Sequence, residues 1–196
     1  MKKIALLLAN GTEEVEALSV LDCLYRGGVE VDLIGINEVN HIISSHNVKI
    51  EVNKILSSLS KDDYSDYEAI VIPGGIPGAT NLRDNDKVIE FLQYMNDNNK
   101  LCAAMCAGPI VLAKAGIISN KKVTSYPNFN EPLINANGIY TDEIVCVDKN
   151  IITARGPAIS IYFGLEILEY ICGKEKREQI AEQMLIPLLE KSIKNE

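Results

Sequence analysis

A single cysteine stands where a short apolar strand gives way to a helix. Residues 101–104 have the length of a buried strand, and apolar residues return at helical density from Ile110. Cys106 therefore occupies a sharp turn, which its small neighbours Ala107 and Gly108 allow. Unpaired N–H groups at a helix N-terminus favour a thiolate, so we predict a nucleophile with a lowered pKa. The alternative is an ordinary buried thiol, since free cysteine is often buried.

An acidic residue shares the apolar face of the first predicted helix. At about 100° per residue, Glu16 falls on the stripe of Val20 and Cys23. Desolvation there raises the pKa of a carboxyl group towards neutrality, which suits a general acid/base. The alternative is a first-turn carboxylate that faces water, and it fits Glu13 and Glu14 better.

A glycine turn, Pro73-Gly74-Gly75, follows the predicted strand 67–72. Binding crevices of open α/β sheets lie at the carboxyl ends of strands, so this turn should open beside Cys106. There the N–H groups of Gly75 and Ala107 can donate to a developing oxyanion. The alternative is a plain strand-to-helix turn, and the glycine spacing fits neither phosphate-binding loop.

The elements that must position these groups alternate between strand and helix. The first half predicts strands at 4–9, 29–36, 67–72 and 101–104, and helices at 13–26 and 88–96. The continuous apolar strands are typical of a parallel sheet covered on both faces. With no repeat or linker, we predict one α/β domain over residues 1–196.

Weaker signals fill the remaining stretches. We predict short strands or a hairpin at 41–43 and 48–52, a brief strand at 121–124 and a loop at 126–138. A hairpin of 143–147 and 151–154 with a three-residue loop should follow. The chain should then end with a helix after Pro157 that stops at Gly173 and a last helix at 174–190. His41 and His46 are interpreted as solvated loop residues, because their spacing offers no further metal ligands.

The composition of the chain argues against nucleic-acid and membrane partners. The net charge is −8, from 19 Lys and Arg against 27 Asp and Glu, and no basic block suggests nucleic-acid binding. The apolar run after Lys3 is too short for a signal peptide or a membrane span, so we expect a cytoplasmic chain with no membrane partner. Five cysteines without CxxC spacing favour reduced thiols and argue against a disulfide framework or zinc site.

Four motifs in order resemble those of the ThiJ/PfpI superfamily, in its DJ-one/YajL-like branch. They lie at 9–16, 72–75, 103–109 and 153–157. The resemblance implies a flavodoxin-like three-layer sandwich, a homodimer and no cofactor. It also matches Cys106 to the reactive cysteine and Glu16 to its protonated partner, with the remaining family positions at Gly74, Gly75, Ala107 and Arg155.

The same resemblance implies a small-molecule aldehyde substrate. Family members are credited with glyoxalase activity on 2-oxoaldehydes such as methylglyoxal, with deglycase activity on their adducts, and with stress sensing through cysteine oxidation. We therefore expect a glyoxalase or deglycase, and the alternative is a non-catalytic redox sensor or chaperone acting through Cys106.

The chain also departs from the family pattern. Tyr126 stands where the human-like branch has a histidine, and an anion-binding arginine is absent near Ser45 and His46. A phenol with a pKa near 10 is a poor base at pH 7. The protease-like branch has histidine where this chain has Ala107, so an intracellular cysteine protease ranks lower. An amidotransferase-like protein ranks lower too, because it would need a downstream histidine–glutamate pair.

Overall fold

The molecule is built around a seven-stranded sheet with the order β10-β11-β7-β6-β1-β2-β5. The structure is a computed structural model that describes residues 2–194. The strands are β1 (Lys3–Leu8), β2 (Glu30–Gly35), β5 (Lys54–Ile55), β6 (Ala69–Ile72), β7 (Leu101–Met105), β10 (Val145–Asp148) and β11 (Ile151–Ala154). All neighbours run parallel except β10 and β11. The order β2-β1-β6-β7-β11 is that of a flavodoxin-like sheet, which confirms the predicted fold.

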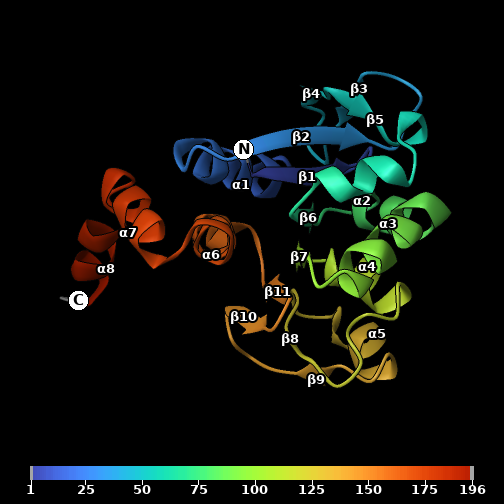
Figure 1. Cartoon of the computed structure of the whole chain (residues 1–196). Coiled ribbons are helices and arrows are strands. Elements are labelled where there is room, and N and C mark those ends of the chain that lie inside the picture. Colours follow the sequence, from blue (N-terminus) through green and yellow to red (C-terminus); the bar gives the residue numbers. More distant parts are fainter. Residues whose placement is uncertain (1, 195–196) are drawn as a thin grey trace.

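Helices cover both faces of this sheet and make three layers (Figure 1). One face carries α2 (Gly78–Arg83), α3 (Asp86–Asp97) and α4 (Pro109–Lys114), and the other carries α1 (Glu14–Arg26) and α6 (Ser160–Cys172). Beyond α6 the chain continues into α7 (Lys174–Gln183) and α8 (Ile186–Lys194), on the far side of α6 from the sheet (Figure 1). Within residues 2–194, no helix combines the length and apolarity needed to cross a bilayer.

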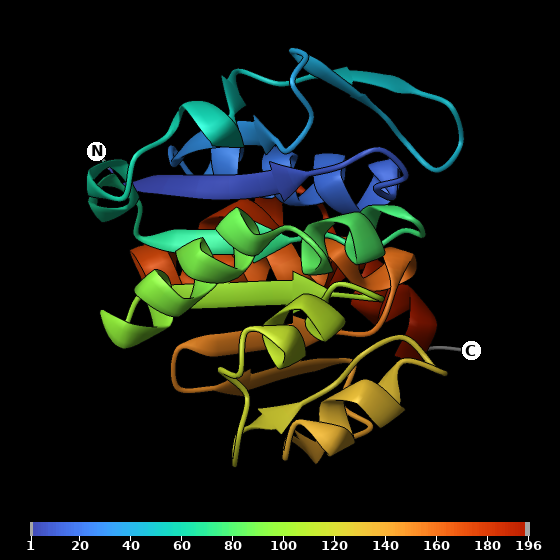
Figure 2. The same cartoon turned by 90° about the vertical axis from the view of Figure 1, so that its right-hand side faces the viewer.

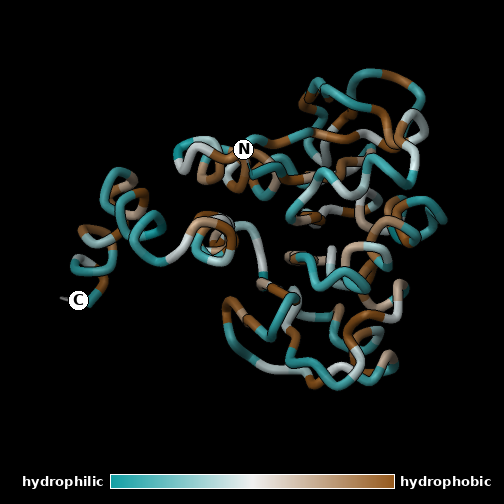
Figure 3. Tube along the Cα trace, in the orientation of Figure 1, coloured by the Kyte–Doolittle hydropathy of each residue, from teal (hydrophilic) through white to brown (hydrophobic). Residues whose placement is uncertain are grey.

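The buried strands serve two cores because their side chains alternate between the faces. In β1, Ala5 and Leu7 join the core under α2–α4, whereas Ile4, Leu6 and Leu8 join the core under α1 and α6. All five side chains are fully buried. A continuous apolar run is therefore what a strand between two helical layers requires, and Figure 3 shows hydrophobic residues along the interior strands.

Two small sheets flank the main one. The hairpin predicted after β2 is present as antiparallel β3 (His41–Ile43) and β4 (Lys49–Glu51). On the opposite side, β8 (Lys122–Val123) pairs in parallel with β9 (Ile139–Tyr140). Figure 2 shows the two pairs at opposite edges of the molecule, so neither covers the centre of the sheet.

Three predictions in the second half are wrong in detail. The stretch predicted as a loop contains α5 (Asn130–Asn135), which begins with Pro132 in its first turn and buries Leu133. The β10–β11 hairpin turns over two residues, 149 and 150, rather than three. The predicted last helix is two helices, because Leu185 has a left-handed φ of 61° and Pro187 sits in the first turn of α8. Sequence reasoning missed α2 altogether.

Candidate active site

Cys106 stands on a strained turn between β7 and α4, as predicted. Its φ of 58° is in the left-handed region, which costs a residue with a side chain on the order of 1–3 kcal/mol. Two neighbouring segments hold this conformation. The Cys106 N–H donates to the Ala154 carbonyl at 2.9 Å, and the Cys106 carbonyl accepts from the Tyr126 N–H at 2.9 Å. The elbow is therefore clamped by backbone hydrogen bonds on both sides.

Glu16 is fully buried on α1, as the stripe predicted. Its Oε2 accepts a 2.7 Å hydrogen bond from the Gly74 N–H. Its Oε1 is buried and has no hydrogen-bond partner that meets ordinary geometry in the described part of the chain. The carboxyl group also interacts with the Cys106 thiol, so the predicted acid and the predicted nucleophile share one site.

The glycine turn after β6 fits between these two side chains. A Cβ on Gly74 would lie 2.7 Å from the Cβ of Cys106 and 2.7 Å from Oε2 of Glu16. Neither neighbour has room to retreat, because one is on the strained elbow and the other is fully buried. Only glycine therefore lets the turn bring its N–H to the carboxyl group.

Two backbone amides lie beside the sulfur. The N–H groups of Gly75 and Ala107 lower the pKa of Cys106, which shows that they are close to the thiol. Gly75 has a φ of 88°, a left-handed conformation that glycine adopts freely. The sequence predicted these two amides as donors to an oxyanion, and that role stays a prediction.

Burial governs the acid. Desolvation raises the pKa of Glu16 from 4.5 to about 7, although its contacts with the thiol and the Gly74 amide lower it. The predicted direction is therefore confirmed. At neutral pH the carboxyl group exchanges a proton readily, as a general acid/base must.

The prediction of a lowered thiol pKa is wrong. Burial and the adjacent Glu16 carboxylate raise the pKa of Cys106 to about 12, and the two backbone donors do not offset them. A second negative charge on this buried pair is opposed by the first. Above pH 7 the pair consequently keeps one proton, on the thiol, and the sulfur becomes a strong nucleophile when Glu16 accepts that proton.

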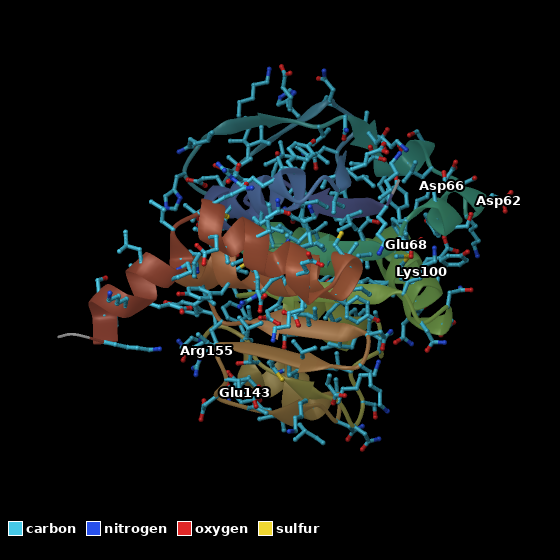
Figure 4. The ribbon with its side chains drawn as sticks, turned by 60° about the vertical axis from the view of Figure 1, so that its left-hand side comes forward. Asp62, Asp66, Glu68, Lys100, Glu143 and Arg155 are labelled. Atoms are coloured by element: carbon cyan, nitrogen blue, oxygen red, sulfur yellow. The ribbon has the colours of Figure 1, made fainter. Side chains whose placement is uncertain are left out.

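The two remaining predicted residues lie at the edge of the site. The Arg155 guanidinium bonds to the carbonyl and Oδ1 of Asp142, at 3.3 and 3.2 Å. Figure 4 shows Arg155 at the end of the molecule away from Glu68 and Lys100, which precede β6 and β7. Tyr126 contacts the elbow through its backbone, and its side chain is 44% exposed.

The hairpin β3–β4 brings polar groups to the start of α1. The His46 Nδ1 lies 2.9 Å from Glu14 and 3.7 Å from Glu13, and Ser45 donates to Glu13 at 2.8 Å. His46 is exposed, as predicted. The argument that no further metal-ligating group lies near it is wrong, because Glu13, Glu14 and His46 offer ligand atoms within 4.8 Å of one another. Residues 32 positions apart meet here only through folding.

The other cysteines differ from Cys106. All five are free, and Cys23, Cys102 and Cys146 are buried. Burial raises the pKa of Cys23 and of Cys102 to about 12. Cys172 is half-buried like Cys106, but it lies at the end of α6. Only Cys106 combines partial access with a carboxyl partner in the described chain.

Sequence reasoning missed two parts of the site. The Ala154 carbonyl anchors the elbow because β11 pairs with β7, and no local sequence pattern shows that these two strands are neighbours. Asp142 holds Arg155 from a stretch without any motif. The pairing of β11 with β7 follows from the flavodoxin-like order, so that order is the signal that could have found Ala154.

Comparisons with known proteins give one consistent result. Residues 2–170 match the DJ-1/PfpI family. Protein dj-1beta of Drosophila melanogaster is 36% identical over 187 residues, which cover 95% of this chain and 98% of that protein. Protein DJ-1 homolog A of Arabidopsis thaliana is 30% identical over 94% of this chain, which spans about half (47%) of the plant protein. The structure of oxidised Toxoplasma gondii DJ-1 aligns with a TM-score of 0.87 at 32% identity, covering 94% of this chain and 98% of that one.

Proposed function

The chain belongs to the DJ-1/PfpI family, and from this we propose that it is a cysteine-dependent glyoxalase that needs no cofactor. Its substrate is a 2-oxoaldehyde such as methylglyoxal, and its product is the corresponding 2-hydroxy acid. The observation that carries the proposal is that the half-buried Cys106 and the fully buried Glu16 carboxyl group lie on either side of Gly74, close enough for each to shift the pKa of the other. A nucleophile paired with an acid/base of pKa about 7 suits an internal proton transfer.

The first step forms a bond between sulfur and carbon. Glu16 takes the thiol proton as the Cys106 sulfur attacks the aldehyde carbon, and the carbonyl electron pair moves to oxygen. The N–H groups of Gly75 and Ala107 stabilise that oxyanion, and each such donor is worth about 3 kcal/mol in comparable sites. Protonation of the oxyanion by Glu16 then gives a hemithioacetal and restores the carboxylate.

The second step moves hydrogen between adjacent carbons. The Glu16 carboxylate removes the hydrogen of the former aldehyde carbon as a proton, and the electron pair left behind forms an enediolate with the neighbouring keto carbon. The hydroxyl proton passes from one oxygen to the other, and Glu16 returns its proton to the neighbouring carbon, which leaves a thioester of the 2-hydroxy acid. Water then cleaves the bond to sulfur and restores the thiol. The substrate is oxidised at one carbon and reduced at the other, so the reaction consumes only water.

The same steps extend to deglycation. In an early adduct of a 2-oxoaldehyde with a thiol or amine, the bond from carbon to sulfur or nitrogen breaks, the thiol or amine leaves with the proton of the adduct hydroxyl, and the aldehyde is regenerated. The Cys106 sulfur then attacks this aldehyde, and the later steps are unchanged. The proposal therefore covers free 2-oxoaldehydes and their early adducts as one substrate class.

Lactate formation from methylglyoxal without glutathione tests the proposal. We expect turnover in the unmodified protein and a loss of at least about 100-fold in Cys106→Ala and Glu16→Gln, the usual size of a general acid/base contribution. Cys172→Ser is the matched control, because that thiol is also half-buried but lies on α6. Undiminished turnover in Cys106→Ala or Glu16→Gln would contradict the assignment.

A second candidate function is redox sensing through the same sulfur. Its support is the half-buried position of Cys106 beside a carboxyl group, together with the relative from Toxoplasma gondii whose structure is of the oxidised protein. Each of two peroxide molecules transfers one oxygen to the sulfur and leaves as water, which converts the thiol to a sulfinic acid. Glu16 then hydrogen-bonds the sulfinate.

Mass spectrometry after mild peroxide treatment tests this candidate. We expect a gain of two oxygens on Cys106 before any other cysteine changes, because the buried thiols are inaccessible. Selective oxidation with negligible methylglyoxal turnover would favour the sensor over the enzyme. Equal oxidation of Cys106 and Cys172 would contradict a dedicated sensor.

A further inference from the structure

A pocket of about 260 Å³ lies beside the elbow, and the mechanism above does not use it. Its walls include the ring of Tyr126 with Pro127 on one side, and Pro157 and Ile159 on the other. These side chains present carbon rather than hydrogen-bonding groups. The pocket thus suits an apolar group.

Both walls are attached to the nucleophile through its own backbone. The Tyr126 N–H donates to the Cys106 carbonyl, and the Cys106 N–H donates to the carbonyl of Ala154, after which the second wall begins. Each hydrogen bond is 2.9 Å long. The pocket therefore adjoins the residue that carries the nucleophile, and each of its walls is joined to the backbone of that residue.

The Tyr126 ring contacts the second wall of the pocket. A Cβ on Gly156 would meet a ring carbon of Tyr126 at 3.2 Å, so the ring lies against the backbone of the opposite wall. The one charged side chain of the lining, Arg155, is paired with Asp142. Its guanidinium group therefore has an acidic partner that is not part of the lining.

We infer that this pocket binds the substituent on the keto carbon of the 2-oxoaldehyde, and that the chain favours aromatic or branched aliphatic substituents over methyl. The inference rests on the proposed function and names its substrate class. Pockets for drug-sized ligands begin at roughly 300 Å³, so this smaller one suits a single ring. Tyr126 is the specificity-determining residue, because a ring placed there packs against its face.

Alkylation of Cys106 tests the pocket without glyoxalase turnover. The probes are iodoacetamide and its N-phenyl derivative; in both, sulfur bonds to the methylene carbon, iodide leaves and the thiol proton passes to solvent. The quantity measured is the alkylation rate constant of Cys106 with the N-phenyl derivative divided by that with iodoacetamide, resolved by peptide mass spectrometry. This ratio is then divided by the same ratio for glutathione. Variants are Tyr126→Ala, Tyr126→Phe and Ile159→Ala, and the control is Tyr170→Ala, whose side chain is also 44% exposed.

We expect a ratio well above one for the unmodified protein and Tyr126→Phe. Tyr126→Ala should lower it about tenfold, which corresponds to ~1.4 kcal/mol of lost binding. Ile159→Ala should lower it too, and it serves as the second variant if Tyr126→Ala does not fold. A ratio unchanged in both alanine variants, or lowered equally by Tyr170→Ala, would overturn the inference.

Turnover measurements separate this inference from the proposed function. If both stand, kcat/KM for phenylglyoxal exceeds that for methylglyoxal, and Tyr126→Ala reverses the preference. A lowered alkylation ratio with no turnover of either aldehyde would remove the glyoxalase but support an apolar pocket beside Cys106. Normal methylglyoxal turnover with an unchanged ratio would remove the pocket and leave the glyoxalase.

Discussion

Replacing the buried acid should stabilise the protein while it removes activity. Glutamine has the shape of Glu16 and keeps an oxygen that accepts the 2.7 Å hydrogen bond from the Gly74 N–H. It cannot ionise. The substitution Glu16→Gln therefore removes the cost of holding a carboxylate where no water reaches it and where Oε1 lacks a partner among the described residues.

The magnitude follows from the raised pKa. Because the folded-state pKa of Glu16 is about 7 rather than 4.5, the protonated form stabilises the fold, and this contribution is complete below pH 4.5 and lost as the pH rises through 7. At ~1.4 kcal/mol for each pKa unit, the loss by pH 8 is about 3 kcal/mol. Glutamine does not titrate, so the advantage of Glu16→Gln should grow by that amount between pH 4.5 and pH 8.

Thermal unfolding at several pH values and one protein concentration measures this. A chain of this size changes its Tm by roughly 2–4 °C per kcal/mol, so the Tm difference between Glu16→Gln and the unmodified protein should grow by about 10 °C from pH 4.5 to pH 8. Glu14→Gln is the matched control, because hydrogen bonds and His46 hold the pKa of Glu14 below its usual value. Glu14→Gln should therefore be less stable than the unmodified protein at neutral pH. A Tm difference for Glu16→Gln that stays constant with pH would refute the reasoning.

Three further outcomes are expected. The kcat/KM for methylglyoxal should rise with pH to a plateau with an apparent pKa of about 7, because the carboxylate form of Glu16 is the base. A flat profile measured from pH 5.5 to 8.5 would argue against Glu16 as the base. Gly74→Ala should abolish turnover and lower stability by about 1–3 kcal/mol in denaturant unfolding, since its Cβ would lie 2.7 Å from that of Cys106; near-normal turnover would show that the turn can yield. Asp32→Asn should lower the free energy of unfolding by about 3 kcal/mol in the same assay, because the buried carboxylate bridges Lys3 and Lys54 at 3.1 and 2.9 Å. The stability difference between variant and unmodified protein should vanish at low pH, where Asp32 is protonated in both the folded and the unfolded state. A loss of stability that persists at low pH would point to packing instead.

Local patterns determined most elements and the identity of the reacting groups. The apolar run of β1 predicts a strand buried on both faces, and the small residues around Cys106 predict its elbow, since each signal depends on neighbours along the chain. The position of Glu16 on the apolar stripe of α1 predicts its burial in the same way. The family motifs then ordered these groups into one site.

The tertiary structure decided the pKa values and the neighbours of these groups. A helix N-terminus predicts a low thiol pKa, but burial and the charge of Glu16, which lies 90 positions earlier, raise it. Contact between β11 and β7 places the Ala154 carbonyl under the elbow, and the fold brings the 155–159 wall against Tyr126. The sequence by itself therefore determined which side chains can react. Their protonation and the shape around them depend on desolvation and on charges brought close by folding, which no local pattern contains.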